Sequence, residues 1–182
     1  LDPENELVIK RVIHTTADFD YADNLTFSDH AVQKGIAALK SGCDIVTDTQ
    51  MAKAGINKTI LASLGGEVHC FMSDPDIAQE AKTRGVTRAF VSMERAAMLQ
   101  KPCIFAIGNA PTALLSLEAL MEENKVAPAL IIGVPVGFVN VEASKEQIID
   151  AARAPYIVAR GRKGGSNVAA AICNALLYQI RR

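Results

Sequence analysis

The chain has 182 residues, of which 49% are hydrophobic and 21% are charged, so it can bury a core and is neither a disordered nor a fibrous protein. Its 19 lysines and arginines nearly balance its 20 aspartates and glutamates. Because so small a net charge gives no overall field that attracts nucleic acid, we expect no nucleic-acid partner.

The first predicted element is a helix over residues 3–13, with Pro3 in its first turn and His14 directly after it. A second helix is predicted to begin at Ser28 and Asp29, whose side chains can cap it, and to end at Gly42. Five strands are predicted over residues 44–47, 67–71, 102–107, 128–132 and 156–160. Helices are predicted between and after them over residues 57–64, 76–84, 88–99, 112–123, 144–152 and 167–180.

This alternation of strands and helices is typical of an α/β fold. We expect residues 1–182 to form a single three-layer α/β/α domain around a mainly parallel central sheet of about five strands. No internal repeat and no linker divides the chain.

Three of the predicted strands run directly into glycine-rich turns. These turns are residues 108–112, 133–138 and 161–167. In an open parallel sheet the loops that follow the strands lie along one edge, where ligands bind. Glycine allows close approach of the backbone, and a helix that starts after such a turn directs free N–H groups at anions. The sequence therefore predicts one site, built from three loops, for an acidic ligand.

The cysteines and the apolar stretches indicate where the protein works. Four cysteines (43, 70, 103 and 173) have no Cys-x-x-Cys spacing and lie among apolar residues, which favours buried reduced thiols and a cytoplasmic protein. The longest apolar stretch, residues 126–141, contains prolines and glycines, so we expect no transmembrane helix and no membrane partner.

The three histidines are candidate proton donors, because histidine is readily tuned to titrate near neutral pH. We interpret His30, in the first turn of a helix, as a surface or capping residue, and His69, in a strand, as a packed sheet residue. His14 differs because a polar turn with hydroxyls and carboxylates follows it. From the residues alone, both a structural and a catalytic role remain open for His14.

Other known chemistries lack their sequence patterns. There is no phosphate-binding Gly-x-x-x-x-Gly-Lys-Ser/Thr loop, no Gly-x-Gly-x-x-Gly, no calcium loop, no His-Glu-x-x-His and no Gly-x-Ser-x-Gly. We therefore expect no nucleotide cofactor and no metal ligands. Thr87 and Arg88, at a predicted helix start, and the pair Arg162 and Lys163 could each grip a carboxylate.

Taken together, the three glycine turns and the segment Arg11-Val12-Ile13-His14 resemble the precorrin-8X methylmutase family of cobalamin biosynthesis, from about residue 11 to the end of the chain. The resemblance implies an isomerase that moves a methyl group from C11 to C12 of a tetrapyrrole with several carboxylates. Since the shift is internal to the substrate, it implies neither a redox cofactor nor a methyl donor.

The resemblance also implies roles for individual residues. His14 is the implied catalytic acid. The implied substrate-binding residues are Arg11, Asn57, Lys58, Thr87, Arg88, Asn109, Gly133, Gly164, Gly165 and Ser166. Asp48 matches a position in the family, but no role follows for it.

Members of the family are homodimers, so we expect a homodimer here. They also carry a further segment before the residues that match, which leads us to expect a shortened or incomplete chain. There are two alternatives. One is a corrinoid-binding protein, served by the same loops, that holds and hands on the product without chemistry. The other is an unrelated small-molecule enzyme on a similar sheet, such as a hydrolase, which the absence of a nucleophile motif disfavours.

Overall fold

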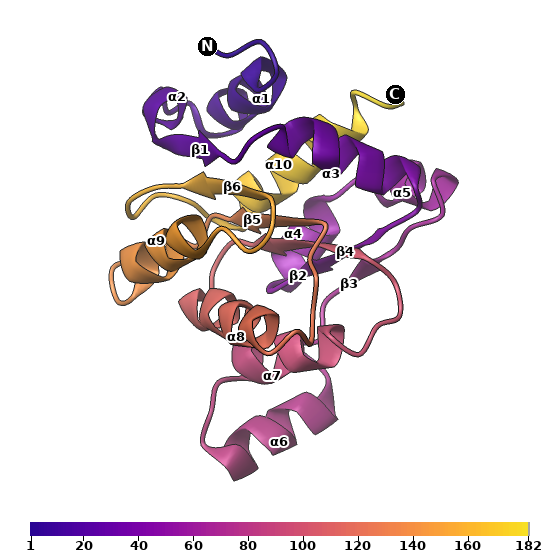
Figure 1. Ribbon diagram of the computed structural model, residues 1–182, viewed down its shortest axis with the longest axis vertical. Helices are drawn as coiled ribbons and strands as arrows, with labels where there is room; N and C mark the ends of the chain where they lie inside the picture. The colour runs from indigo at the N-terminus through magenta and orange to yellow at the C-terminus, as the bar shows by residue number, and fades with distance from the viewer. Residues whose placement is uncertain (182) are drawn as a thin grey trace.

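A six-stranded sheet forms the centre of the protein in the computed structural model, which describes residues 1–181 (Figure 1). The strands are β1 (Leu25–Phe27), β2 (Asp44–Thr47), β3 (Val68–His69), β4 (Cys103–Ile107), β5 (Leu130–Gly133) and β6 (Tyr156–Ala159). Their order is β1-β6-β5-β4-β2-β3, and every neighbouring pair is parallel except β1 and β6. The predicted α/β fold with a mainly parallel sheet is confirmed.

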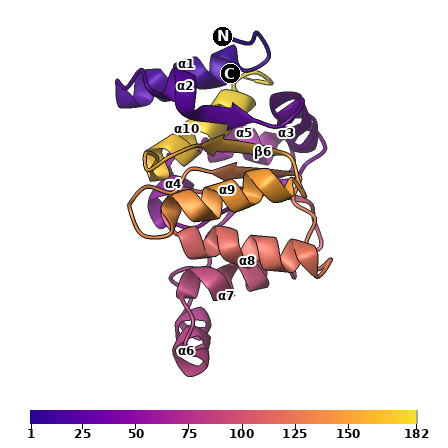
Figure 2. The same cartoon turned by 60° about the vertical axis from the view of Figure 1, so that its left-hand side comes forward.

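Helices cover both faces of the sheet. They are α1 (Glu6–Thr16), α2 (Tyr21–Asn24), α3 (Ala31–Lys40), α4 (Gln50–Gly55), α5 (Lys58–Ser63), α6 (Pro75–Arg84), α7 (Arg88–Ala96), α8 (Pro111–Glu122), α9 (Val141–Ala151) and α10 (Ser166–Leu177). One face packs mainly against α3 and α10, with α1 outside α10, and the other against α7, α8 and α9, while α6 lies outside α7 (Figure 1, Figure 2).

Strand β4 illustrates how the sequence builds this core. Its five residues are all buried. Because successive side chains of a strand point to opposite faces, Ile104 and Ala106 pack with α10, whereas Phe105 and Ile107 pack with α7 and α8. A continuous apolar run is what a strand buried on both faces requires.

Several predicted boundaries were wrong. Strand β1 and helices α2 and α4 were not predicted, β3 is shorter than expected, and α9 begins at Val141 rather than residue 144. The second predicted helix begins at Ala31, and its N-cap residue His30 makes no side-chain cap bond. The expected cap, Ser28, is engaged elsewhere, since its hydroxyl accepts a bond from the backbone N–H of Tyr156 at 2.8 Å.

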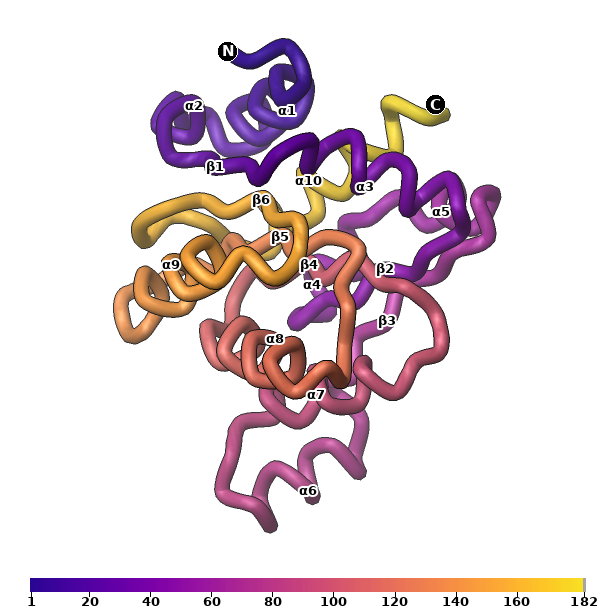
Figure 3. Tube along the Cα trace, viewed as in Figure 1, coloured from indigo at the N-terminus to yellow at the C-terminus, as the bar shows by residue number. Residues whose placement is uncertain are grey.

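The parallel strands place the loops that follow them along one side of the sheet, which we call the carboxyl edge. Residues 108–110, 134–140 and 160–165 lie there together with the start of α4. In Figure 2 this edge faces left, and the C-terminal end of α1 reaches the same side. The tube trace shows α1 lying beside α10 outside the sheet (Figure 3).

Candidate functional site

Asp48 connects the end of β2 to the first glycine turn. Its buried carboxylate accepts hydrogen bonds from the backbone N–H groups of Gly108 (2.8 Å), Asn109 (2.9 Å) and Ala110 (2.6 Å). Burial raises the pKa of Asp48, and the three amide donors act against that shift. The carboxylate holds the turn in place, a role for Asp48 that the sequence alone does not reveal.

The glycines allow the three loops to touch through their backbones. A Cβ atom on Gly108 would lie 2.7 Å from the carbonyl oxygen of Gly165, and one on Gly164 would lie 2.0 Å from that of Val134. The N–H of Gly165 donates to the same Val134 oxygen at 2.9 Å. No larger residue fits at positions 108 and 164 without movement of the backbone. The three predicted loops therefore pack against one another as one unit, and their binding of a ligand stays a prediction.

Ser166 and Gly133 complete this unit from the inside. The Ser166 hydroxyl lies 2.7 Å from the Thr49 hydroxyl, which also caps α4. Gly133 is buried at the end of β5, where a Cβ atom would meet Val158 and Leu114 at ordinary contact distances. Both positions support the loops, and their predicted contacts with substrate stay predictions.

The cations of the third loop already have partners. Lys163 Nζ lies 2.7 Å from Asp18 and 2.6 Å from Asp20. The hydrogen bond from Lys163 to Asp18 holds the pKa of Asp18 below its ordinary value. Arg162 pairs with Glu142 at 3.1 Å, and its guanidinium lies 5.3 Å from the ring centre of Phe138. The predicted second grip on a carboxylate is thus engaged within the protein.

His14 lies exposed in the last turn of α1, in a groove of about 470 Å³ between α1 and α10. Arg11 lies one turn earlier in the same groove, with its guanidinium 4.7 Å from the ring centre of Tyr178. Because Asp18 follows α1 and pairs with Lys163, the end of α1 that carries His14 is fastened to the third glycine loop.

Asn57 and Lys58 lie beside the last turns of α10, at its far end from Ser166. The Asn57 side chain caps α5, and its backbone N–H donates to Asn174 at 2.8 Å. Lys58 Nζ donates to three backbone carbonyls at the end of α4. These contacts give both residues structural roles, so their predicted binding of substrate stays a prediction.

Thr87 and Arg88 lie on the opposite face of the sheet, at the start of α7. The Thr87 hydroxyl accepts from the Phe90 N–H at 3.1 Å, as expected for a helix cap, and lies 2.9 Å from the hydroxyl of Thr112. Arg88 is exposed, and among residues 1–181 its guanidinium has one hydrogen-bond contact, a long one of 3.5 Å to the carbonyl of Met72. Asn109 is exposed in the turn before α8. This group leaves a guanidinium open to a ligand.

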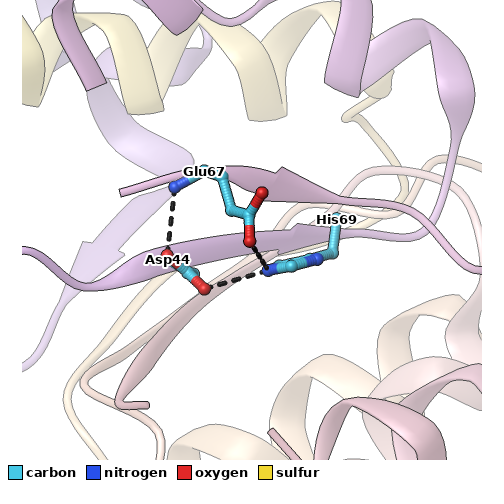
Figure 4. Close-up of side chains that lie close together, drawn as sticks. All are labelled: Asp44, Glu67 and His69. Atoms are coloured by element: carbon cyan, nitrogen blue, oxygen red, sulfur yellow. Dashed lines mark hydrogen bonds and ion pairs between the residues drawn. The ribbon is translucent and has the colours of Figure 1, made fainter. Parts of the chain in front are cut away.

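A second cluster of titratable groups lies at the other edge of the sheet (Figure 4). His69 Nε2 is 2.9 Å from Asp44 and 3.6 Å from Glu67, and Lys101 Nζ is 2.7 Å from Asp44. Asp44, Glu67 and His69 are near enough to one another to hold a metal ion. We interpret the cluster as an ion-pair network, because the ammonium of Lys101 already compensates the buried carboxylate. His69 is a strand residue, as expected.

Two further expectations, for His30 and for the cysteines, agree with the structure. His30 is exposed and lies 3.0 Å from Glu4. All four cysteines are free and buried. Within residues 1–181, no helix has the length and apolar character that crossing a lipid bilayer requires.

Comparison with known proteins supplies the family. The family model for CbiC, Precorrin-8X methylmutase, matches residues 1–179. A cobalt-precorrin-8 methylmutase of Salmonella typhimurium is 50% identical over 180 residues, covering 98% of this chain and 83% of its own length. A precorrin-8X methylmutase of Pseudomonas aeruginosa is 39% identical over 172 residues, covering 94% and 82%.

Solved structures agree with this result. A precorrin-8X methylmutase from Thermus thermophilus has a TM-score of 0.87 at 37% identity and covers 98% of this chain and 87% of that one. A structure titled precorrin-8X methylmutase related protein has a TM-score of 0.88 at 32% identity. The chain belongs to the precorrin-8X methylmutase family.

Proposed function

We propose that this protein is the isomerase that moves a methyl group from C11 to C12 of precorrin-8X or of cobalt-precorrin-8, with His14 as the general acid. The observation that carries the proposal is the position of His14. It is an exposed imidazole in a groove, on the end of a helix that is fastened to the packed glycine loops of the carboxyl edge.

The chemistry asked of His14 is proton donation. Protonation of the macrocycle makes its conjugated system electron-poor, which favours migration of the methyl group together with its bonding electron pair. The bond from the methyl carbon to C11 breaks as the bond to C12 forms, and the macrocycle then gives up a proton. No electrons are gained or lost overall, so the reaction needs no redox partner.

The groups around this acid suit a substrate rich in carboxylates. Arg11 projects into the same groove as His14, and the ring of Tyr178 beneath its guanidinium restricts where it can lie. Arg88 offers a second guanidinium. A bidentate contact of either with an acetate or propionate arm would orient the ring without taking part in the chemistry.

We further propose that residues 1–182 belong to a single domain, that the protein acts as a homodimer, and that it works in the cytoplasm. Free, buried cysteines are typical of proteins kept in a reducing compartment. Exposed apolar side chains near the carboxyl edge support association with a second copy.

The test is to mix the purified protein with precorrin-8X and with cobalt-precorrin-8 and to follow the visible spectrum, since rearrangement changes the conjugated system. His14→Asn should lower kcat by about a hundred- to ten-thousandfold, the usual range for loss of a general acid, and should still bind product. His30→Asn is the matched control, because His30 is an exposed histidine paired with Glu4 away from the groove.

The alternatives give different results. A corrinoid-binding protein without activity would hold the product and leave both substrates unchanged in the wild type. An undiminished kcat in His14→Asn would remove His14 from the mechanism while leaving the isomerase activity in place.

A further inference from the structure

Lys163 belongs to the third glycine loop, but its side chain binds the turn that follows α1. Its ammonium lies 2.7 Å from the carboxylate of Asp18 and 2.6 Å from that of Asp20. Hydrogen bonds to these two aspartates raise the pKa of Lys163, so the ammonium stays charged at neutral pH. One cation thus connects two parts of the chain that lie 145 residues apart in sequence.

The loop end of this connection is held by its backbone. The carbonyls of Gly161 and Lys163 accept hydrogen bonds from the ammonium of Lys145 at 2.8 and 3.0 Å, and Lys145 is fully buried in α9. The carbonyl between them, that of Arg162, accepts from the N–H of Gly137 at 3.1 Å. Because three successive carbonyls are bound, the side chain of Lys163 starts from a fixed position.

The other end of the connection is coupled to His14 through the last turn of α1. Ala17 ends the helix in the left-handed conformation (φ 56°), and its N–H donates to the carbonyl of Ile13 at 2.7 Å. The hydroxyl of Thr16 donates to a carbonyl one turn earlier in α1 at 2.8 Å and accepts from the N–H of Asp18 at 3.2 Å. His14 lies within this bonded turn, so a displacement of Asp18 would displace the imidazole.

The stretch that carries His14 is weakly packed. Val12 is buried against α10 and Tyr21 is buried in α2, but no side chain between them, over residues 13–20, is buried. Contacts other than apolar packing must therefore fix this stretch. The ion pairs of Asp18 and Asp20 with Lys163 tie it to the carboxyl edge of the sheet.

We propose that Lys163 is a positioning residue for the general acid. By holding Asp18 and Asp20, it fixes the end of α1 and with it the imidazole of His14. The inference rests on the proposed function, because it takes His14 as the acid. It differs from a grip of Lys163 on the substrate, since one ammonium and two carboxylates together carry a net negative charge, which repels a carboxylate of the macrocycle.

The test compares Lys163→Gln with Arg160→Gln. Arg160 is the matched control because it is an exposed cation of the same loop that pairs with Glu146 of α9 instead of the turn after α1. Lys163→Gln should lower kcat by about ten- to hundredfold, as for a misplaced reacting group, and leave KM within about twofold of wild type. Arg160→Gln should change neither constant, and Lys163→Arg, which keeps the charge, should restore most of the lost kcat.

Combining substitutions on both sides of the ion pair separates positioning from substrate binding. The variant with Asp18→Asn and Asp20→Asn should lose kcat to a similar extent, and adding Lys163→Gln to it should cause no further loss, because the groups act as one unit. If Lys163 instead binds the substrate, Lys163→Gln raises KM and its effect multiplies with that of the aspartate variant. Either of these two findings would overturn the proposal.

Hydrogen exchange gives a readout that needs no substrate. The amides of Ala17 and Asp18 are bonded within the turn, so they should exchange faster in Lys163→Gln and at the wild-type rate in Arg160→Gln. Unchanged exchange at these amides, or an unchanged kcat, in Lys163→Gln would remove the positioning role. Both results are compatible with a wild type that converts precorrin-8X, so they would leave the proposed function standing.

Discussion

Asp44 is a buried carboxylate whose ionisation contributes to folding. Burial raises its pKa, but hydrogen bonds from Lys101, His69 and the N–H of Glu67 outweigh this and hold the pKa below its ordinary value. A group with a lowered pKa stabilises the fold above its unfolded pKa, and this stabilisation is lost as the pH falls through the folded pKa. Asp44 therefore contributes to stability at neutral pH and ceases to do so in acid.

Asp44→Asn should lower the free energy of unfolding by about 1–3 kcal/mol at pH 7, because the ammonium of Lys101 and the imidazole of His69 lose their ionised partner. Urea unfolding as a function of pH measures this. The difference in the free energy of unfolding between wild type and variant should begin to shrink below about pH 4, where Asp44 of the unfolded wild-type chain becomes protonated. Asp76→Asn, at an exposed pair with Arg95, is the control and should change little. A pH-independent difference would contradict this assignment.

Single residues were predictable where their contacts are local. Thr87 and Asn57 cap helices that begin one residue later, and both caps follow from residue type and position. Ser28 has the same chemistry but bonds to Tyr156, which is 128 residues away. The groove around His14 could not be predicted from the sequence either, because Tyr178 contacts Arg11 only when α10 packs on α1.

At the scale of elements, the length of a helix or strand decides whether the sequence predicts it. The buried strands β4 and β5 were visible as apolar runs between glycines and prolines. β1 has only three residues and exists because it pairs with β6. α4 has six residues, too few to be stable alone, and it depends on its Thr49 cap and its packing on α10. Elements this short are created by tertiary contacts.

Asp48 shows how one side chain can govern the loop between two elements, β4 and α8. In Asp48→Asn one carboxylate oxygen becomes an NH₂ group that faces a backbone N–H, so at least one of the three amides loses its acceptor. The free energy of unfolding should fall by about 1–3 kcal/mol. We also expect a higher KM, since Asn109, a predicted substrate-binding residue, moves with the loop.

Thermal unfolding and steady-state kinetics measure both effects. Asp29→Asn, an exposed aspartate on the surface, is the matched control. If Asp48→Asn unfolds and turns over like wild type, the carboxylate does not hold the turn.

At the scale of the whole molecule, the three-layer arrangement was predictable because alternating strands and helices allow few other solutions. The grouping of exposed apolar side chains on its surface was not predictable. Large apolar side chains remain exposed near the carboxyl edge: Phe19 (78%), Met51 (71%), Val136 (46%), Phe138 (79%) and Val139 (80%). They are scattered through the sequence, and only the fold gathers the loops that carry them. Exposed apolar groups of this kind are typical of surfaces that meet another molecule.

We expect the occupant of the segment 136–139 to be a second copy of the chain. Sedimentation of the wild type should then give the mass of a dimer, and replacing both Phe138 and Val139 by Ser should shift the equilibrium toward the monomer, because association loses most of the apolar area that this segment buries. Turnover per chain should fall on dilution of the variant. Met98→Ser, which removes an exposed methionine near the end of α7, is the control and should stay dimeric. A variant that remains a dimer but no longer binds product would instead assign the segment to the macrocycle, and the interface would have to lie on another face.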